Sequence, residues 1–160
     1  MLFLIDSSVF VALFNDADPH VDLARLLFLT IEERGDDVVI PTLVIAEIAA
    51  TLARMHALPD PGRFLATLSP FRATPVDVPF AHQFVHAVAR SHISLKASDA
   101  IVVFTAHFSH AALITLDQQM IAQAAKYVST FTPQQYIKLT SKESLPTRAH
   151  EENNHQPAGD

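Results

Sequence analysis

The sequence predicts an α/β protein, a three-layer α/β/α sandwich with a mostly parallel sheet of about five strands. Short apolar runs alternate with longer amphipathic segments along the chain, and this alternation is typical of parallel sheets. The apolar runs are continuous and do not alternate with polar residues, as expected of strands that are covered on both faces. With 160 residues and no internal repeat, a single domain is expected.

The first half of the chain supplies two central strands. Leu2–Ile5 and Val38–Ile40 are short runs of large apolar residues and predict buried strands. Ser7 and Ser8 are favourable N-caps for a short helix through Phe14. Further helices are expected at His20–Arg34, from Pro41 to about His56, and at Phe64–Leu68. Proline near the expected starts and glycine after the expected ends support these boundaries.

The second half continues the alternation to about residue 140. We expect strands at Thr74–Val78, Ala112–Leu116 and Tyr127–Phe131, the last at an edge of the sheet. Helices are expected from Pro79 to about Ser91, at Ser98–His110, at Gln118–Ala125 and at Pro133–Leu139. From Ser141 onward polar residues dominate and the periodicity ends. We therefore expect a domain over residues 1–140 and a flexible polar tail over 141–160.

Composition excludes several classes of protein. The chain contains no cysteine, which rules out disulfides, thiol catalysis and cysteine-based zinc sites and suits a reducing cytoplasm. The segment before Asp6 is too short for a signal-peptide core. No apolar run approaches the roughly 20 residues of a membrane span. The sequence therefore predicts a cytoplasmic protein that does not bind membranes.

The charge of the chain is concentrated in a few positions. The formal net charge is −6, which counts against a nucleic-acid binder with a broad basic face. Residues 1–140 carry nine Lys and Arg and thirteen Asp and Glu. The excess of four equals the number of acids that lie beside apolar runs, namely Asp6, Glu47, Asp99 and Asp117. Two divalent cations would neutralise these four positions.

These four acids are expected to meet at one edge of the sheet. Asp6 and Asp117 follow predicted strands, and ligands of open parallel sheets bind beyond the carboxyl ends of the strands. Asp99 lies in the first turn of its helix, where the helix dipole favours an anion. Glu47 lies in the second turn of a helix that starts at the same edge. All four carboxylates can therefore converge.

Converging carboxylates call for a positive charge. No Lys or Arg lies within three residues of Asp6, Glu47 or Asp117, so the acids would raise one another's pKa. Mg²⁺ or Mn²⁺ with oxygen ligands would relieve the repulsion, and two such ions can activate a water for phosphodiester hydrolysis. Alternatively, Asp6 or Asp117 alone could be a helix cap and Asp99 a partner of the helix dipole. Glu47, beside a buried stripe, is the hardest to explain structurally.

Four short motifs carry a family resemblance. They are Leu4-Ile-Asp-Ser-Ser-Val9, the helix with Glu47, Ser98-Asp-Ala100 with Ala106 on the same helix, and Thr115-Leu-Asp117. In order and spacing the chain resembles PIN-domain ribonucleases, most closely the VapC toxins of toxin–antitoxin pairs. It departs from the pattern in having Met120 where Phe is frequent, and in lacking a Gly before the fourth strand.

The resemblance implies a function and a set of partners. It implies Mg²⁺-dependent endoribonuclease activity, with Asp6, Glu47, Asp99 and Asp117 as the catalytic and metal-binding acids. It assigns Ser8 and Thr115 to polar support of the site, although Ser8 could equally be a plain N-cap. The expected partners are an RNA substrate and a protein antitoxin, with a homodimer possible.

The antitoxin is expected to carry a basic segment. An acidic pocket is a receptor for an Arg side chain, whose planar fork suits carboxylates. Apolar surface around Phe64–Phe71 could receive a partner helix, although packing explains these residues equally well.

Other readings remain open from sequence alone. The domain could be a PIN-like module that binds RNA or protein without cleaving. A phosphoaspartyl receiver also places Asp after a strand, but it needs paired acids and a Lys that this chain lacks. His82 and His86 have the spacing of zinc ligands on a helix, without a third ligand. Arg90, His92 and Lys96 could contact phosphates or simply be solvated.

Overall fold

A five-stranded parallel sheet forms the centre of the protein. The computed structural model describes residues 1–143, and all four strand pairings in it are parallel. The order across the sheet is β3-β2-β1-β4-β5. The strands are β1 (Leu2–Ile5), β2 (Asp37–Pro41), β3 (Arg72–Thr74), β4 (Ala112–Ile114) and β5 (Thr130–Phe131). The predicted fold class is confirmed.

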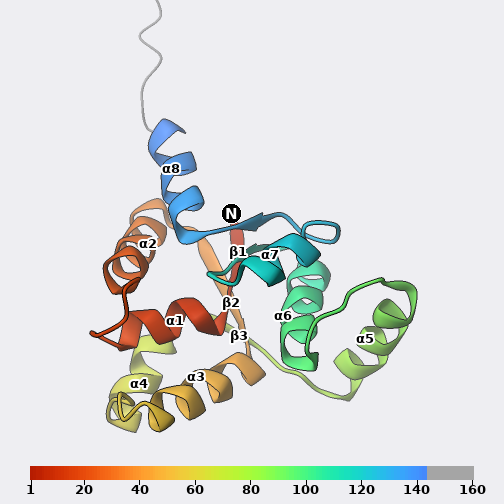
Figure 1. Ribbon diagram of the computed structural model, residues 1–160, viewed down its shortest axis with the longest axis horizontal. Coiled ribbons are helices and arrows are strands. Elements are labelled where there is room, and N and C mark those ends of the chain that lie inside the picture. The colour runs from red at the N-terminus through yellow and green to blue at the C-terminus, as the bar shows by residue number, and fades with distance from the viewer. Residues whose placement is uncertain (144–160) are drawn as a thin grey trace, which may run out of the picture.

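Eight helices within residues 1–143 flank the sheet (Figure 1). They are α1 (Ser7–Phe14), α2 (Val21–Arg34), α3 (Thr42–Arg54), α4 (Pro61–Leu68), α5 (Val78–Arg90), α6 (Ala97–Phe108), α7 (Gln118–Ala124) and α8 (Pro133–Glu143). In Figure 1, α1 to α4 lie to one side of the strands, and α5 to α7 lie to the other. The chain runs from β1 to β2 and β3 on one side and returns to β4 and β5 on the other side of β1. Because the crossovers between parallel strands are right-handed, the two sets of helices cover opposite faces of the sheet. None of the helices described is long and apolar enough to cross a membrane.

The central strand is fully enclosed, as its continuous apolar run requires. Leu4 and Ile5 are completely buried, with Leu4 opposite Val39 of β2 and Leu113 of β4. Because β1 has a parallel neighbour on each side, its carboxyl end is the point where the chain switches direction across the sheet. Such switch points open a crevice beyond the strand ends.

Four predicted strands differ in extent from the observed ones. The second is one residue longer at each end and the fourth ends at Ile114 instead of Leu116, and the third and fifth differ more. The third strand was expected at Thr74–Val78 but lies at Arg72–Thr74. Pro75 has no N–H to continue the ladder, and the Asp77 side chain accepts a hydrogen bond from the Phe80 N–H at 2.9 Å and caps α5. The expected strand Tyr127–Phe131 is limited to its last two residues, because the Tyr127 and Val128 N–H groups bond back to Ala124.

The C-terminal helix is longer than the one or two turns expected. α8 runs to Glu143 and so continues past the predicted domain boundary at residue 140. The rest of the predicted polar tail, residues 144–160, lies outside the described residues. The helix is fixed to the fold by Tyr136, which is 1% exposed and meets the Phe3 ring edge-on at a centroid distance of 5.0 Å.

A buried carboxylate joins three distant parts of the chain. The Asp36 side chain, only 5% exposed, accepts hydrogen bonds from Tyr136 Oη at 2.7 Å, from Arg34 Nε at 3.2 Å and from the Met1 amino group. Burial alone would raise the pKa of Asp36, but these donors outweigh it and lower the pKa. Burial and the adjacent carboxylate raise the pKa of Tyr136. The cluster ties α8 to the amino ends of β1 and β2.

Tyr136→Phe should destabilise the protein by about 1–3 kcal/mol, because it leaves a buried carboxylate short of a donor. Urea unfolding of the variant and the wild type measures the loss. Tyr127→Phe is the matched control, since the hydroxyl of Tyr127 accepts only the His92 N–H at 3.1 Å, an exposed hydrogen bond. An equal loss in both variants would contradict the role of the Asp36 cluster.

Candidate active site

Asp6 lies at the switch point, directly after β1, and is 4% exposed. Its backbone N–H donates to the Ile114 carbonyl of β4 at 3.0 Å, which fixes the residue between the two strands. Its side chain is the N-cap of α1 and accepts from the Ser8 N–H at 3.3 Å. The sequence left open whether Asp6 or one of the two following serines caps this helix. In the structure the cap is Asp6.

Two hydroxyl groups hold one oxygen of the Asp6 carboxylate. Ser8 Oγ donates to Asp6 Oδ2 at 2.6 Å, and Thr115 Oγ1 donates to the same atom at 2.9 Å. Each hydroxyl also accepts a backbone N–H, from Leu116 at 3.2 Å and from Asp117 at 3.0 Å respectively. Ser8 and Thr115 thus link the segments after β1 and β4. Among the described residues, the one hydrogen bond to Asp6 Oδ1 comes from Ser7 Oγ, at 3.5 Å.

Two other acids of the predicted site affect the pKa of Glu47, which lies in the second turn of α3. The side chain is half-buried. Burial is the main cause that raises its pKa, and the charges of Asp6 and Asp99 raise it further. A hydrogen bond from Ser7 and the charge of Arg54 work in the opposite direction. Asp6 and Asp99 therefore each lie close enough to Glu47 to repel its charge.

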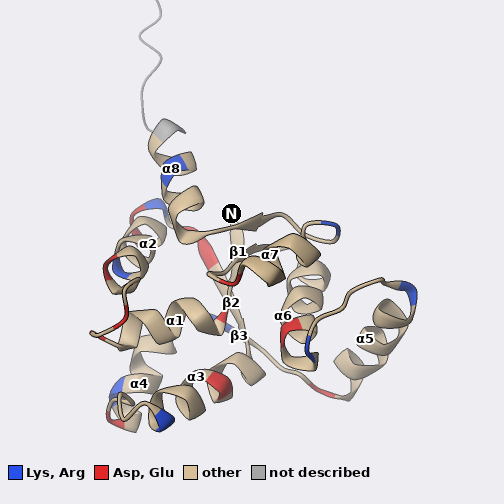
Figure 2. Cartoon of the chain, in the orientation of Figure 1, with Lys and Arg blue, Asp and Glu red and all other residues tan. Residues whose placement is uncertain are grey.

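Asp99 approaches from the other face of the sheet. It is half-buried in the first turn of α6, and it accepts from Ser98 Oγ at 3.1 Å. Because α6 leads into β4, its amino end lies at the carboxyl edge of the sheet. In Figure 2 the acidic positions on α3, on α6 and at the start of α1 surround this edge.

Asp117 is placed differently from the other three acids. Its side chain is exposed and caps α7, with Oδ1 accepting from Gln119 and Met120 N–H groups at 2.7 and 3.0 Å. Its backbone N–H donates to Thr115 Oγ1, which in turn donates to Asp6. The structure thus brings Asp6, Glu47 and Asp99 together, and sets Asp117 at the rim with a capping role of its own.

The side chains around these acids leave their charge uncompensated. In the described part of the chain, none of the four carboxylates forms an ion pair with Lys or Arg. The nearest influence of opposite sign on Glu47 is Arg54, two turns along α3. Uncompensated, partly buried carboxylates favour binding of a cation.

The donor set fits a hard divalent cation, although the acids do not form a closed cage. No group of three or more His, Cys, Asp or Glu within residues 1–143 has the arrangement of a metal site. Mg²⁺ does not require one, because it keeps several waters and binds through one or two carboxylates. His82 and His86 on α5 take part in no such group.

Two serines near the acids were not predicted from the sequence to be site residues. Ser7 lies between Asp6 and Glu47, and Ser98 bonds to Asp99. The contact of Ser98 with Asp99 could have been predicted, because the two residues are adjacent in the sequence. The role of Ser7 could not, because a Ser after Asp6 is equally typical of a helix cap. Only the approach of α3 to α1 reveals the second contact of Ser7.

Fold and site together define a class of α/β proteins that gather carboxylates at the switch point of a parallel sheet. The profile of the PIN domain matches residues 3–127 of this chain. The chain belongs to the PIN-domain family. No curated protein sequence matches it.

Solved structures with this fold include proteins of toxin–antitoxin systems. A toxin–antitoxin complex from Klebsiella pneumoniae matches with 21% identity and a TM-score of 0.61, over 82% of this chain and 97% of that one. VapC20 of Mycobacterium tuberculosis, a toxin that cleaves the sarcin–ricin loop, matches with 18% identity and a TM-score of 0.62, over 80% and 97%. VapBC2 of Rickettsia felis, bound to a DNA fragment from its promoter, matches with 12% identity and a TM-score of 0.61, over 82% and 98%. At these identities the similarity establishes the shared fold.

Glu47→Gln should stabilise the metal-free protein at neutral pH and have little effect in acid. Because the pKa of Glu47 is raised in the folded state, the folded protein binds more protons than the unfolded chain between the two pKa values. Stability therefore falls as the pH rises through this window, and the variant avoids that loss. We expect a gain below about 1 kcal/mol, because solvent screens a half-buried side chain.

Thermal unfolding in EDTA at about pH 4 and about pH 8 tests this expectation. Glu33→Gln, an exposed position on α2, is the control for the change in net charge. A gain for Glu47→Gln that is equal at both pH values, or equal to that of the control, would contradict the repulsion described above.

Proposed function

We propose that the protein is a metal-dependent endoribonuclease that hydrolyses RNA phosphodiesters, and that it is the toxin of a toxin–antitoxin pair. The observation that carries the proposal is the approach of Asp6, Glu47 and Asp99 from three elements, without an ion pair to Lys or Arg. Membership of the PIN-domain family supports it. So does the similarity in fold to an RNA-cleaving toxin.

The side chains would have different tasks in this activity. Asp6 and Asp99 would hold Mg²⁺, or Mn²⁺ in its place, and Glu47 and Asp117 would contact it directly or through water. When bound, the ion would activate a water and stabilise the leaving oxygen of the phosphodiester. Ser8 and Thr115 occupy Asp6 Oδ2, so that Oδ1 remains for the ion. Asp117 Oδ1 already accepts two N–H groups, which favours contact through its other oxygen.

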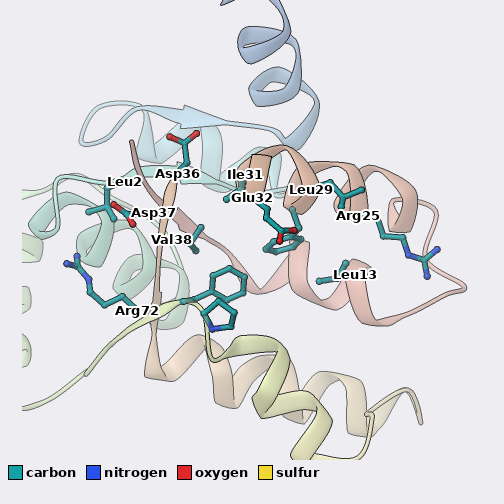
Figure 3. Close-up of a pocket in the computed structure, with 13 residues that line it drawn as sticks. Leu2, Leu13, Arg25, Leu29, Ile31, Glu32, Asp36, Asp37, Val38 and Arg72 are labelled. Carbon is teal, nitrogen blue, oxygen red and sulfur yellow. The ribbon is translucent and has the colours of Figure 1, made fainter. Parts of the chain in front are cut away.

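The proposed antitoxin would need both basic and apolar surfaces. Its basic segment would place an Arg among the carboxylates, which would block both metal and RNA. Its apolar part would occupy a cavity of about 720 Å³ between α2 and the segment before β3, lined in part by Leu13, Phe28, Leu29 and Phe71 (Figure 3). Figure 3 shows α1 passing beside this cavity. Because Asp6 caps the start of α1 and Leu13 lies near its end, roughly 10 Å separate the two sites.

The cavity refines the expectation of an apolar groove around Phe64–Phe71. Phe64 and Leu68 are 4% and 5% exposed and belong to the core, so packing explains them. Phe71 and Leu29 line the cavity, and Leu29 is 55% exposed. Exposed apolar residues beside a cavity are typical of a partner surface.

The alternative is a PIN-like module that binds RNA or protein without cleaving. Two observations favour it: Asp6 and Asp117 both cap helices, and the acids form no closed metal cage. A capping role would explain two of the four acids without chemistry. It does not explain Glu47 and Asp99.

One experiment separates the two functions. The purified protein is incubated with total RNA in Mg²⁺, Mn²⁺ or EDTA, alone and after co-expression with the product of the neighbouring gene. Cleavage that needs metal and is suppressed by a co-purifying neighbour supports the toxin. Binding of RNA without cleavage in either metal supports the non-cleaving module and overturns the proposed enzyme.

A further inference from the structure

An open groove lies between α5 and the end of α6, away from the acids. Its volume is about 540 Å³, and it is lined by Gln83, His86, Ala87, Arg90, His107 and Phe108. We call these six residues the α5–α6 groove. His86 and Arg90 are four residues apart, so they lie on the same face of α5. Nothing in the proposed acidic site uses any of these side chains.

The groove combines cationic and aromatic groups. Arg90 offers a planar fork of N–H donors that matches phosphate. His107 Nδ1 lies 3.1 Å from the Tyr127 carbonyl oxygen, and since a carbonyl oxygen only accepts, Nδ1 carries the donated proton. Its Nε2 is then left for another partner. The Phe108 ring, half-buried against Phe80 and Phe104, adds an aromatic surface to the same groove.

The charge around the groove is opposite to that of the chain as a whole. Residues 78–110 contain one Arg, one Lys and five of the nine histidines, and Asp99 is their only acid. The whole chain has a formal charge of −6. With neutral histidines, Arg90, Lys96 and Asp99 give this segment a formal charge of +1, and Arg90 is the cation that lies in the groove.

A basic groove with an aromatic wall fits single-stranded nucleic acid better than a free anion. Proteins that bind single strands combine cations that follow the backbone with aromatic rings on which bases stack. His107 lies eight residues after Asp99 on α6, a rise of about 12 Å. One short strand could thus reach the groove while a phosphodiester lies at the acids.

We propose that the α5–α6 groove binds the backbone of single-stranded RNA and guides it to the acidic site. The part of this inference that leads the RNA to the acidic site rests on the proposed function, because cleavage would occur at these acids. It assigns Arg90 and His86 to phosphate contacts and Phe108 to base stacking, and His107 Nε2 to accepting a hydrogen bond from a ribose hydroxyl or a base N–H. An acidic peptide of a protein partner is the competing occupant.

The test measures RNA binding without cleavage. A fluorescently labelled single-stranded RNA of mixed sequence is titrated with wild type, Arg90→Gln and Arg63→Gln in EDTA, over a series of salt concentrations. Arg63 is exposed on α4 and controls for the same loss of charge. We expect weaker binding by Arg90→Gln at each salt concentration. The slope of log affinity against log salt should fall by about 0.7, with a smaller effect in the control.

Amide chemical shifts locate the RNA independently of any variant. Shifts on adding RNA should concentrate on α5 and the second half of α6. Equal binding by Arg90→Gln and Arg63→Gln, or shifts confined to other elements, would overturn the inference. So would a wild type that binds no RNA at low salt while an acidic peptide shifts the groove residues.

Failure of the proposed function is separable from failure of this inference. A wild type that binds RNA through the groove but cleaves none with Mg²⁺ or Mn²⁺ overturns the enzyme and retains the groove. A wild type that cleaves RNA, with Arg90→Gln and Arg63→Gln equal in both binding and cleavage, retains the enzyme and overturns the groove.

Discussion

Asp6→Asn should reduce metal-dependent RNA cleavage by more than about 100-fold while the protein remains folded. Asn is as good an N-cap as Asp, and its side-chain oxygen can still accept from Ser8 and Thr115. What the variant loses is the negative charge that would hold the cation. Loss of a residue that only supports a metal ligand typically costs 10–100-fold, so loss of a ligand should cost at least as much.

The matched control for this variant is Asp60→Asn. Asp60 caps α4 and accepts from the Gly62 and Arg63 N–H groups at 3.0 and 3.2 Å, so the same chemical change is made at a cap outside the site. Cleavage rates of both variants are compared with the wild type in Mg²⁺, with circular dichroism as the check on folding. If Asp6→Asn keeps more than a tenth of the wild-type rate, Asp6 is a structural cap and not a ligand.

Saturation with Mg²⁺ should raise the free energy of unfolding by about 2.7 kcal/mol at a concentration 100 times the dissociation constant. The gain follows mass action, and the physical source is relief of the repulsion that Glu47 experiences from Asp6 and Asp99. For a chain of this size the thermal midpoint should rise by about 5–10 °C. Mn²⁺ should act in the same way.

Thermal unfolding with Mg²⁺, with Mn²⁺ and with EDTA measures this shift. Asp6→Asn should lose most of it, and Asp60→Asn should keep it. Calorimetric titration of Mn²⁺ into the same three proteins gives the affinity directly. An unchanged midpoint in the wild type, or equal affinity for wild type and Asp6→Asn, would refute cation binding at these carboxylates.

The sequence predicted the sheet well because its strands are continuous apolar runs. Leu2–Ile5 was identified with its observed bounds, since a run buried on both faces leaves little ambiguity. The third strand was misplaced because Arg72-Ala-Thr74 contains no run of large apolar residues and Pro75 interrupts the pattern. Edge strands of two or three residues carry too few side chains to define a period.

The candidate site was predictable in part, for a similar reason. Asp6 follows a strand and Asp99 begins the helix that leads into β4, so both lie at the carboxyl edge, and their approach to Glu47 could be anticipated. The capping bonds of Asp117 depend on the local backbone, and the sequence left this reading open. The contact of Ser7 with Glu47 and the Asp36 cluster join segments far apart in the chain. Only tertiary packing determines such contacts.

The position of β1 in the middle of the sheet has a consequence for synthesis of the protein. Asp6 leaves the ribosome early, but the residues that surround it, Asp99 on α6 and Thr115 after β4, are made much later. A growing chain that stops before β4 therefore lacks both the strand beside Asp6 and the hydroxyl that orients it. If the protein is a toxin, its own translation is protected, because the catalytic centre cannot assemble until about three quarters of the chain has been made.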